Sequence, residues 1–219
     1  MSMPKTLTDI VYFKIRNDII HGDLLPGSKL KIEPLRKRYD IGASPIREAL
    51  SRLCADGFVA IKGQQGFSVM EMSKEDLIDV TNSRVLIENE VLKLSILNGD
   101  DDWESKVVGS FHRLTKAAHS SDKDTNNNSE KYNKIFHDCL LSACESETLL
   151  KFYHILYDQH KRYRHLSREA IHIKRNIHNE HTDIYEAALN KDVKSALKAN
   201  EIHIRKTAEI VMELERDEW

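Results

Sequence analysis

Apolar positions recur at helical spacing in the first part of the chain and then give way to short strand-like runs. Residues 6–21 carry isoleucine or valine at positions 10, 11, 15, 19 and 20, about one helical turn apart, which predicts a helix with one broad apolar face. Two shorter helices are predicted over residues 32–39 and 44–55. The runs 58–61 and 66–70 are rich in β-branched and aromatic residues and predict two adjacent strands. The expected order is therefore three helices followed by a hairpin.

Residues with special backbone preferences mark the ends of these elements. Gly22 ends the first helix and Gly57 ends the third. Ser44 is expected to cap the third helix, with Pro45 in its first turn, because a serine oxygen can accept from the N–H groups that are free there. Residues 63–66, with glycine at both ends, form the expected hairpin tip. Two helices joined by a tight turn and followed by a hairpin are the layout of a winged helix-turn-helix.

From Ser73 onward the pattern is helical, and no strand-like run recurs. Ser73 is expected to cap a long helix that has Asp76 at its third position. The polar stretch 120–129 predicts a loop. Further helices are expected over about residues 102–121, 127–145, 147–166, 168–189 and 191–216. The predicted fold class is mostly α, with a winged helix-turn-helix (three helices and a β-hairpin) over residues 1–72 and an all-helical bundle over residues 73–219.

The composition narrows the class of protein. Hydrophobic residues make up 40% of the chain and charged residues 31%, which is typical of a soluble globular protein. No apolar run approaches the roughly 18–20 residues that span a bilayer, and the first residues lack the apolar core of a signal peptide. We therefore expect a cytoplasmic protein without a membrane partner.

The net charge of −2 conceals an asymmetry along the chain. Residues 1–70 carry eleven Lys and Arg against seven Asp and Glu, whereas residues 71–219 carry 22 against 28. A basic N-terminal part suits contact with DNA, because neutralising phosphates contributes much of the affinity.

In a winged helix-turn-helix the second helix of the motif enters the major groove and reads base edges. Arg47 is the strongest candidate for this role, and its guanidinium can pair either with guanine O6 and N7 or with a phosphate. Residues at and within the preceding helix, Lys37 among them, are candidates for contacts with the DNA backbone. Residues at the wing tip are further candidates. The full candidate set for DNA binding is Lys31, Arg36, Arg38, Ser44, Pro45, Arg47, Ser51, Arg52, Gln64, Gln65 and Gly66.

Four stretches together resemble the GntR family of bacterial regulators. They are Asp23 to Leu30, Pro45 to Leu53, Asp56 to Val59 and Gly63 to Gly66, in the family's order and spacing. Members commonly carry Ser-Arg just before the recognition helix, where this chain has Gly42 and Ala43. The arginine that reads a base in those members is therefore absent, and the operator sequence of well-known members cannot be transferred.

The C-terminal part resembles the helical sensor domain of the FadR-type branch, in its FCD variety. The resemblance rests on Arg84 with Glu88, on Asn133-Lys134-Ile135-Phe136-His137, on Glu180-His181 and on His203. It implies a metal site inside the helical bundle, formed by Asn133, His137, His181 and His203. Three imidazoles suit a divalent transition metal, with zinc or nickel as the first candidates.

Asn133 stands where the family has an acidic residue. A neutral amide oxygen is a weaker ligand than a carboxylate, and the site with a divalent ion would then carry a net charge of +2. We expect either that an anionic ligand occupies an open coordination position or that the metal is held more weakly.

Arg84 is the candidate partner for a carboxylate on a small organic acid effector, because guanidinium binds carboxylate in a bidentate manner. The alternative for Arg84 is an ion pair with Glu88 on the same helix. Arg162 and Tyr163 are further effector-binding candidates, with Arg164 beside them. The stretches Arg38-Tyr39, Pro45 to Ser51 and Asp102-Trp103-Glu104 are also similar to the glutarate-sensing carbon-starvation regulators, which implies a dicarboxylate effector.

The function implied by these resemblances is that of a ligand-responsive transcription regulator that binds a near-palindromic DNA operator as a homodimer, with repression relieved by the ligand. Two other classes remain open at this stage. A helical interaction module without ligand is one, and a metal-dependent hydrolase is the other. Glu180 lies about 100° around a helix from His181 and is poorly placed as a general base. The chain also lacks HExxH, P-loop, GxSxG and dinucleotide-binding motifs, so we do not expect an enzyme.

Overall fold

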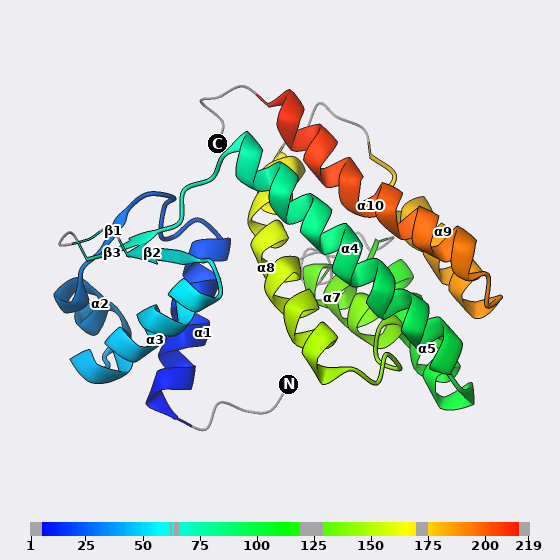
Figure 1. Ribbon diagram of the computed structural model, residues 1–219, viewed down its shortest axis with the longest axis horizontal. Helices are drawn as coiled ribbons and strands as arrows, with labels where there is room; N and C mark the ends of the chain where they lie inside the picture. Colours follow the sequence, from blue (N-terminus) through cyan, green and yellow to red (C-terminus); the bar gives the residue numbers. More distant parts are fainter. Residues whose placement is uncertain (1–5, 62, 64–65, 119–128, 170–174, 215–219) are drawn as a thin grey trace. The chain divides into compact units, whose positions relative to one another are not determined.

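The computed structural model describes residues 6–61, 63, 66–118, 129–169 and 175–214, with the backbone alone for 165–169. The chain forms two compact units (Figure 1). The first comprises Met1–Val80, Tyr157–Ala170 and Val211–Trp219, and the second comprises Thr81–Leu156 and Ile171–Ile210. In the described ranges, no helix is both long enough and apolar enough to cross a membrane.

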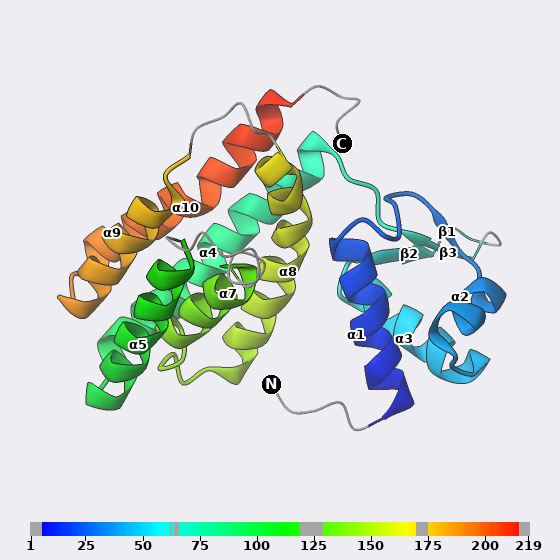
Figure 2. The ribbon, with the colours of Figure 1, turned by 180° about the vertical axis from the view of Figure 1, so that it is seen from behind.

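Three helices, α1 (Leu7–Ile20), α2 (Ile32–Tyr39) and α3 (Ala43–Ala55), belong to the first unit (Figure 2). Helix α1 begins where the Thr6 hydroxyl accepts a hydrogen bond from the Asp9 N–H at 3.1 Å. Its apolar face packs against α3, and both helices contribute to one core. Members of that core include Val11, Tyr12, Ile15, Ile19, Ile46, Leu50, Leu53 and Phe58.

The turn between α2 and α3 differs from the prediction in one detail. Helix α2 ends at Asp40, which adopts the left-handed conformation (φ 52°), and Gly42 is the N-cap of α3. The expectation that Ser44 caps α3 was therefore wrong. Pro45 is the third residue of the helix, where its missing N–H would have had no partner inside the helix, so the helix can begin before the proline.

A small antiparallel sheet completes the winged helix-turn-helix. Strands β1 (Lys29–Leu30), β2 (Val59–Ile61) and β3 (Phe67–Val69) have the order β1-β3-β2, with Val59 opposite Val69. The predicted hairpin is confirmed as β2 and β3. Strand β1 was not expected, because two residues are too few to show a periodic pattern. Gln64 and Gln65 lie outside the described residues.

The remaining helices all follow residue 73. They are α4 (Lys74–Asn98), α5 (Asp101–Ala118), α7 (Ser129–Leu140), α8 (Glu147–Glu169), α9 (Ile177–Leu189) and α10 (Val193–Glu213). Ser73 caps α4 as expected, with its hydroxyl accepting from the Asp76 N–H at 3.1 Å. The predicted fold class, mostly α with a winged helix-turn-helix followed by a helical bundle, is confirmed.

Two of these helices have bounds that differ from the expected ones. Helix α7 ends at Leu140 rather than near residue 145, because the chain turns tightly there and Glu145 has a positive φ of 58°. Helix α9 begins at Ile177 rather than near residue 168. The Asn176 side chain caps it by accepting from the Asn179 N–H at 3.1 Å.

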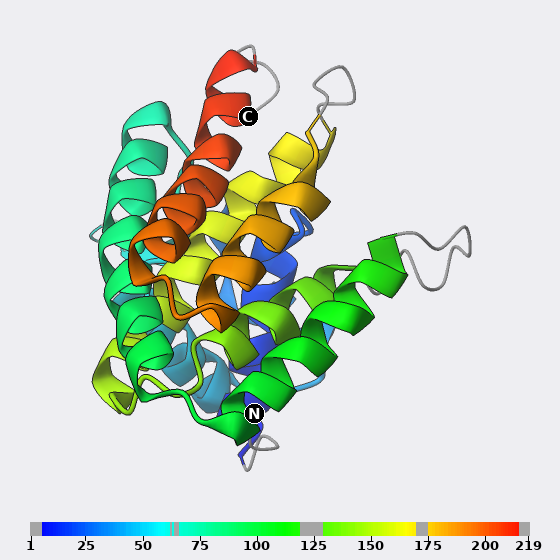
Figure 3. The same cartoon turned by 90° about the vertical axis from the view of Figure 1, so that its right-hand side faces the viewer.

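In the second unit α4 and α10 run side by side in opposite directions (Figure 3). Arg205 donates to the Asn82 side chain at 2.9 Å, and Asn200 donates to Asn89 at 2.9 Å. Helices α5 and α7 pack together as well, and the Trp103 indole N–H donates to the Leu140 carbonyl at 3.2 Å. These contacts hold α4, α7 and α10 so that their polar positions face the interior of the unit.

The buried phenol of Tyr12 makes the stability of the first unit sensitive to alkaline pH. Burial, together with a hydrogen bond to the Asp56 carboxylate, raises the pKa of Tyr12 to about 12. The unfolded chain releases this proton near pH 10, so the contribution is complete below pH 10 and is lost as the pH rises toward 12. We expect the advantage of wild type over Tyr12→Phe in unfolding free energy to shrink by about 2 kcal/mol across this window. Urea denaturation followed by circular dichroism tests this, and an advantage independent of pH would contradict it.

Candidate nucleic-acid interface and metal centre

Helix α3 presents a polar face to solvent. Ser44, Arg47 and Ser51 are exposed on α3, while Ile46 and Leu50 are buried on its opposite side. No described residue makes an ion pair or hydrogen bond with the Arg47 guanidinium. This side chain can therefore reach an external partner without breaking a contact within the protein.

Other arginines of the candidate set are held by carboxylates of the same unit. Arg52 pairs with Asp9 at 2.8 Å and lies over the Tyr12 ring, and this hydrogen bond lowers the pKa of Asp9. Arg38 pairs with Asp18 at 2.6 Å. Arg36 pairs with Glu33, one turn earlier on α2, at 2.8 Å. Among the predicted DNA contacts these three have partners within the protein. Lys31 and Lys37 are exposed.

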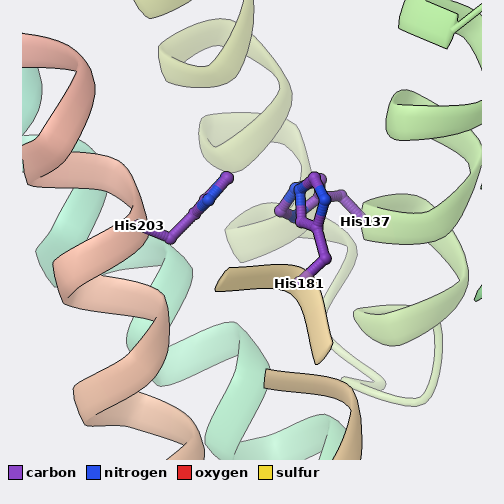
Figure 4. Close-up of side chains that lie close together, drawn as sticks. All are labelled: His137, His181 and His203. Carbon is purple, nitrogen blue, oxygen red and sulfur yellow. The ribbon is translucent and has the colours of Figure 1, made fainter. Parts of the chain in front are cut away.

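Three histidines converge in the interior of the second unit. His137 comes from α7, His181 from α9 and His203 from α10, and their rings point toward one another (Figure 4). Their exposed fractions are 0%, 2% and 5%. One ring nitrogen from each lies within 4.8 Å of the others. The structure thus brings together the three histidines that the resemblance singled out.

Asn133 lies one turn before His137 on α7 and is also buried, with an exposed fraction of 5%. Its Nδ2 is 3.1 Å from Nε2 of His181. Rotation of the amide by half a turn would place Oδ1 at the same point, so the side chain can offer either a donor or a metal ligand to this position. Asn133 therefore belongs to the histidine cluster.

A buried ion pair on α4 lies beside the cluster. Arg84 Nε is 2.8 Å from Glu88 Oε2, and the two side chains are 2% and 1% exposed. Glu88 Oε1 is in turn 3.6 Å from His137 Nδ1. The ion-pair alternative for Arg84 is thus observed. Glu88 contacts both Arg84 and His137, and so connects Arg84 to the histidine cluster.

A second arginine and glutamate pair contacts another histidine of the cluster and was missed from the sequence. Glu180 Oε2 is 2.8 Å from His203 Nδ1, and Arg175 binds both oxygens of Glu180, at distances of 2.7 to 3.2 Å. Arg175 also donates to the His203 carbonyl at 2.8 Å and to Thr207 Oγ1 at 2.9 Å. From the sequence, Glu180 was considered only as a general base, because it adjoins His181. The sequence does not show that Glu180 faces α10.

The other effector-binding candidates belong to the first unit. Arg162 donates to the Met70 carbonyl at 2.6 Å, and Tyr163 hydrogen-bonds to the Asp76 carboxylate. This bond and burial raise the pKa of Tyr163. Arg164 donates to the Tyr157 hydroxyl at 3.2 Å. The structure therefore does not bring Arg162, Tyr163 or Arg164 into the histidine cluster. Their contacts given above are with residues of the first unit.

The cluster has the chemistry of a transition-metal site. Imidazole suits zinc, nickel and copper, and a zinc–nitrogen bond is about 2.0–2.1 Å long. Nitrogens that bind one ion tetrahedrally at that distance are about 3.4 Å apart. The observed separations, all within 4.8 Å, therefore need a closure of at most about 1.4 Å. Carboxylates beside the outer nitrogens of two of the rings are also typical of metal-binding histidines. The residues present therefore fit a metal ion.

Comparison with family profiles gives two matches. The profile described as "Bacterial regulatory proteins, gntR family" matches residues 7–69. The profile described as "FCD domain" matches residues 79–206. The two matches cover the winged helix-turn-helix and the helices that supply the histidine cluster, respectively.

The chain is also similar to individual transcription regulators over nearly its whole length. It is 37% identical to the HTH-type transcriptional regulator BphR of Paraburkholderia xenovorans (strain LB400), covering 94% of this chain and 86% of BphR. It is 32% identical to the HTH-type transcriptional repressor GlaR of Escherichia coli (strain K12), covering 91% of this chain and 93% of GlaR. The solved structure of E. coli McbR/YncC shares the fold, with a TM-score of 0.78 at 20% identity, covering 96% of this chain and 99% of that one.

The buried pair of Arg84 and Glu88 generates a stability prediction. Arg84→Ala leaves the Glu88 carboxylate buried without its cation, which we expect to lower the free energy of unfolding by about 3 kcal/mol. The matched control is Lys93→Ala, which removes an exposed cation that is 3.3 Å from Glu90 on the same helix and should change stability by less than about 0.5 kcal/mol. Urea denaturation measures both. Equal effects of the two variants would show that burial gives the Arg84 pair no special weight.

Proposed function

Because the chain belongs to the GntR family of bacterial regulatory proteins, in the FadR-type branch with an FCD domain, we propose that it represses transcription until a small organic acid binds its helical domain. The observation that carries the proposal is the combination of an uncommitted arginine on the recognition helix with a buried, metal-suited histidine cluster in the same chain. A DNA-binding transcription regulator that responds to a ligand is the function to which both features contribute.

The DNA contacts are proposed for the exposed face of α3 and the surface beside it. Arg47 and Ser44 lie on that face, and Lys31 and Lys37 supply further positive charge. Two copies of the chain would place two recognition helices in successive major grooves, so we propose a homodimer on a near-palindromic operator. Arg36, Arg38 and Arg52 each form a net-neutral pair with a carboxylate, so the proposed positive charge of this surface comes from Arg47 and the two lysines.

The metal is proposed to be held by His137, His181 and His203, with Oδ1 of Asn133 as a further ligand. Zinc or nickel suits this donor set, and the bound ion would supply a positive charge and an open coordination position for an anion. With neutral imidazoles and a neutral amide the site carries a net charge of +2. The nearby Arg84 and Glu88 pair adds no net charge. A dianion is therefore the effector that best neutralises the site.

The effector is proposed to be a C4–C6 dicarboxylate. One carboxylate would occupy the open position on the metal, and Arg84 would meet the other by its terminal nitrogens. The sequence resemblance to glutarate-sensing regulators agrees with this class. The effector can act only through different affinities for the DNA-competent and DNA-incompetent states of the protein. Release of DNA by the effector requires tighter binding to the incompetent state.

The position of Glu180 argues against a metal-dependent hydrolase. Its carboxylate accepts from His203 and from Arg175, so it is engaged in ion pairing rather than directed at a metal-bound water. We propose that the chain is not an enzyme, which agrees with the transcription regulators among its relatives. An interaction module without ligand would give no reason for the buried histidine cluster.

A loss of DNA affinity in Arg47→Ala tests the recognition helix. Duplexes enriched from a random pool by the wild-type protein serve as the probe, and binding is measured by fluorescence anisotropy. We expect at least about a tenfold loss, because a guanidinium contact to a base contributes about 1–3 kcal/mol. Relaxed preference at one base position would assign Arg47 to a base, and a lower salt dependence would assign it to a phosphate.

The control for this measurement is Lys14→Ala, which removes one exposed positive charge from α1. It should leave affinity within about twofold, because α1 is not the helix that enters the groove. Wild-type affinity in Arg47→Ala, with unchanged circular dichroism, would remove Arg47 from the interface.

Metal analysis of the untagged protein tests the centre. We expect near-stoichiometric zinc or nickel in the wild type and its loss in His181→Ala, because that variant removes one of three imidazole ligands. Glutarate, as the dicarboxylate probe, should raise the melting temperature of the metal-loaded wild type only, since a ligand of the folded state stabilises that state. Equal metal content in both proteins would exclude the histidine cluster as the site, and a glutarate shift in metal-free protein would separate effector binding from the metal.

A further inference from the structure

We propose that Glu180, held by Arg175, is a positioning residue that fixes the tautomer and orientation of His203 for metal binding. The inference rests on the proposed metal site and goes beyond the ligand set, because neither Glu180 nor Arg175 is a ligand. It is carried by the 2.8 Å contact between Glu180 Oε2 and His203 Nδ1, together with the contacts that Arg175 makes around it.

The contact selects one of the two ring nitrogens of His203. A neutral imidazole carries its proton on either Nδ1 or Nε2, and only the unprotonated nitrogen can bind a metal. A carboxylate accepts but cannot donate, so the Glu180 contact requires the proton to be on Nδ1. Nε2 of His203 is then the unprotonated nitrogen, the one that can bind a metal. Without Glu180 both tautomers of His203 would be populated. The fraction protonated at Nε2 would then have to move its proton to Nδ1 before this nitrogen could bind a metal.

Arg175 holds the Glu180 carboxylate in the orientation that this contact needs. It donates to both carboxylate oxygens, which fixes the plane of the group. Its bonds to the His203 carbonyl and to Thr207 Oγ1 tie the same guanidinium to α10. The backbone and the imidazole of His203 are therefore both positioned through the Arg175 and Glu180 pair.

The same arrangement recurs, less closely, at His137. Glu88 lies 3.6 Å from His137 Nδ1 and is paired with Arg84, as Glu180 is paired with Arg175. Two of the three imidazoles thus have a carboxylate beside Nδ1, and each carboxylate is neutralised by an arginine. Such outer carboxylates orient the ring and increase its basicity as a ligand. Because each one is paired, they do so without reducing the net positive charge that an anionic effector would meet.

The test compares zinc affinity among full-length variants by competition with a chromophoric chelator. Glu180→Ala should weaken zinc binding by about 10–100-fold, the usual effect of removing an outer partner of a metal-binding histidine. Glu180→Gln should lose less, because its amide oxygen still accepts from Nδ1–H. The matched control is Glu186→Ala, an exposed glutamate on the same helix, which should bind zinc within about twofold of wild type.

A second readout follows the ring nitrogens directly. Long-range ¹H–¹⁵N spectra of the metal-free protein should show His203 protonated at Nδ1 in the wild type, and both tautomers in Glu180→Ala. A role confined to tying α9 to α10 would lower the melting temperature without moving this tautomer signal. If Glu180→Ala is less stable, the same spectra can be recorded for Glu180→Gln, which keeps the shape of the side chain.

The outcomes separate the inference from the metal proposal. Zinc affinity within about threefold of wild type in Glu180→Ala, with an unchanged tautomer signal, would overturn the role of Glu180 while His203→Ala still abolished binding. Failure of the wild type to bind zinc or nickel would overturn the metal site and the positioning role toward it together. Weaker zinc binding with the tautomer shift, in Glu180→Ala and not in Glu186→Ala, supports the inference.

Discussion

Burial of ionisable side chains among α4, α7, α9 and α10 is the constraint on which the arrangement of the second unit depends. A charge removed from water is costly unless it is paired and hydrogen-bonded. Arg84 therefore requires Glu88, and Arg175 and Glu180 require each other. Each pair extends to a histidine of another helix. The two pairs thereby link α4 to α7 and α9 to α10 through polar contacts in the interior.

The same physical rule distinguishes the cations of the first unit. An arginine that already has a carboxylate partner gives up that contact if it turns toward DNA, so Arg52 and Arg38 are costlier to recruit than Arg47. The recognition helix thus has one strong donor that is available at no internal cost. The carboxylates that hold Arg38 and Arg52 also neutralise their charge.

Asn133 connects the composition of the histidine cluster to the kind of ligand it suits. An acidic residue at this position would neutralise one charge of a bound ion, whereas the amide leaves both charges to be met from outside. The paired glutamates do not change this balance, because each is matched by an arginine. Under the proposed function, the protein would orient the ligands of the ion and an anionic effector would neutralise its charge.

The sequence by itself determined the order of the elements, the winged helix-turn-helix and the family, because helical and strand periods and cap residues are local properties. It also marked His137, His181 and His203, although only through the family's spacing. The tertiary structure decided which side chains meet across helices. It moved Arg162 and Tyr163 to the first unit, added β1, and revealed the contact between Glu180 and His203, which are 23 residues apart. Such contacts depend on the rotation of each helix about its axis, which packing over the whole unit sets and no local pattern records.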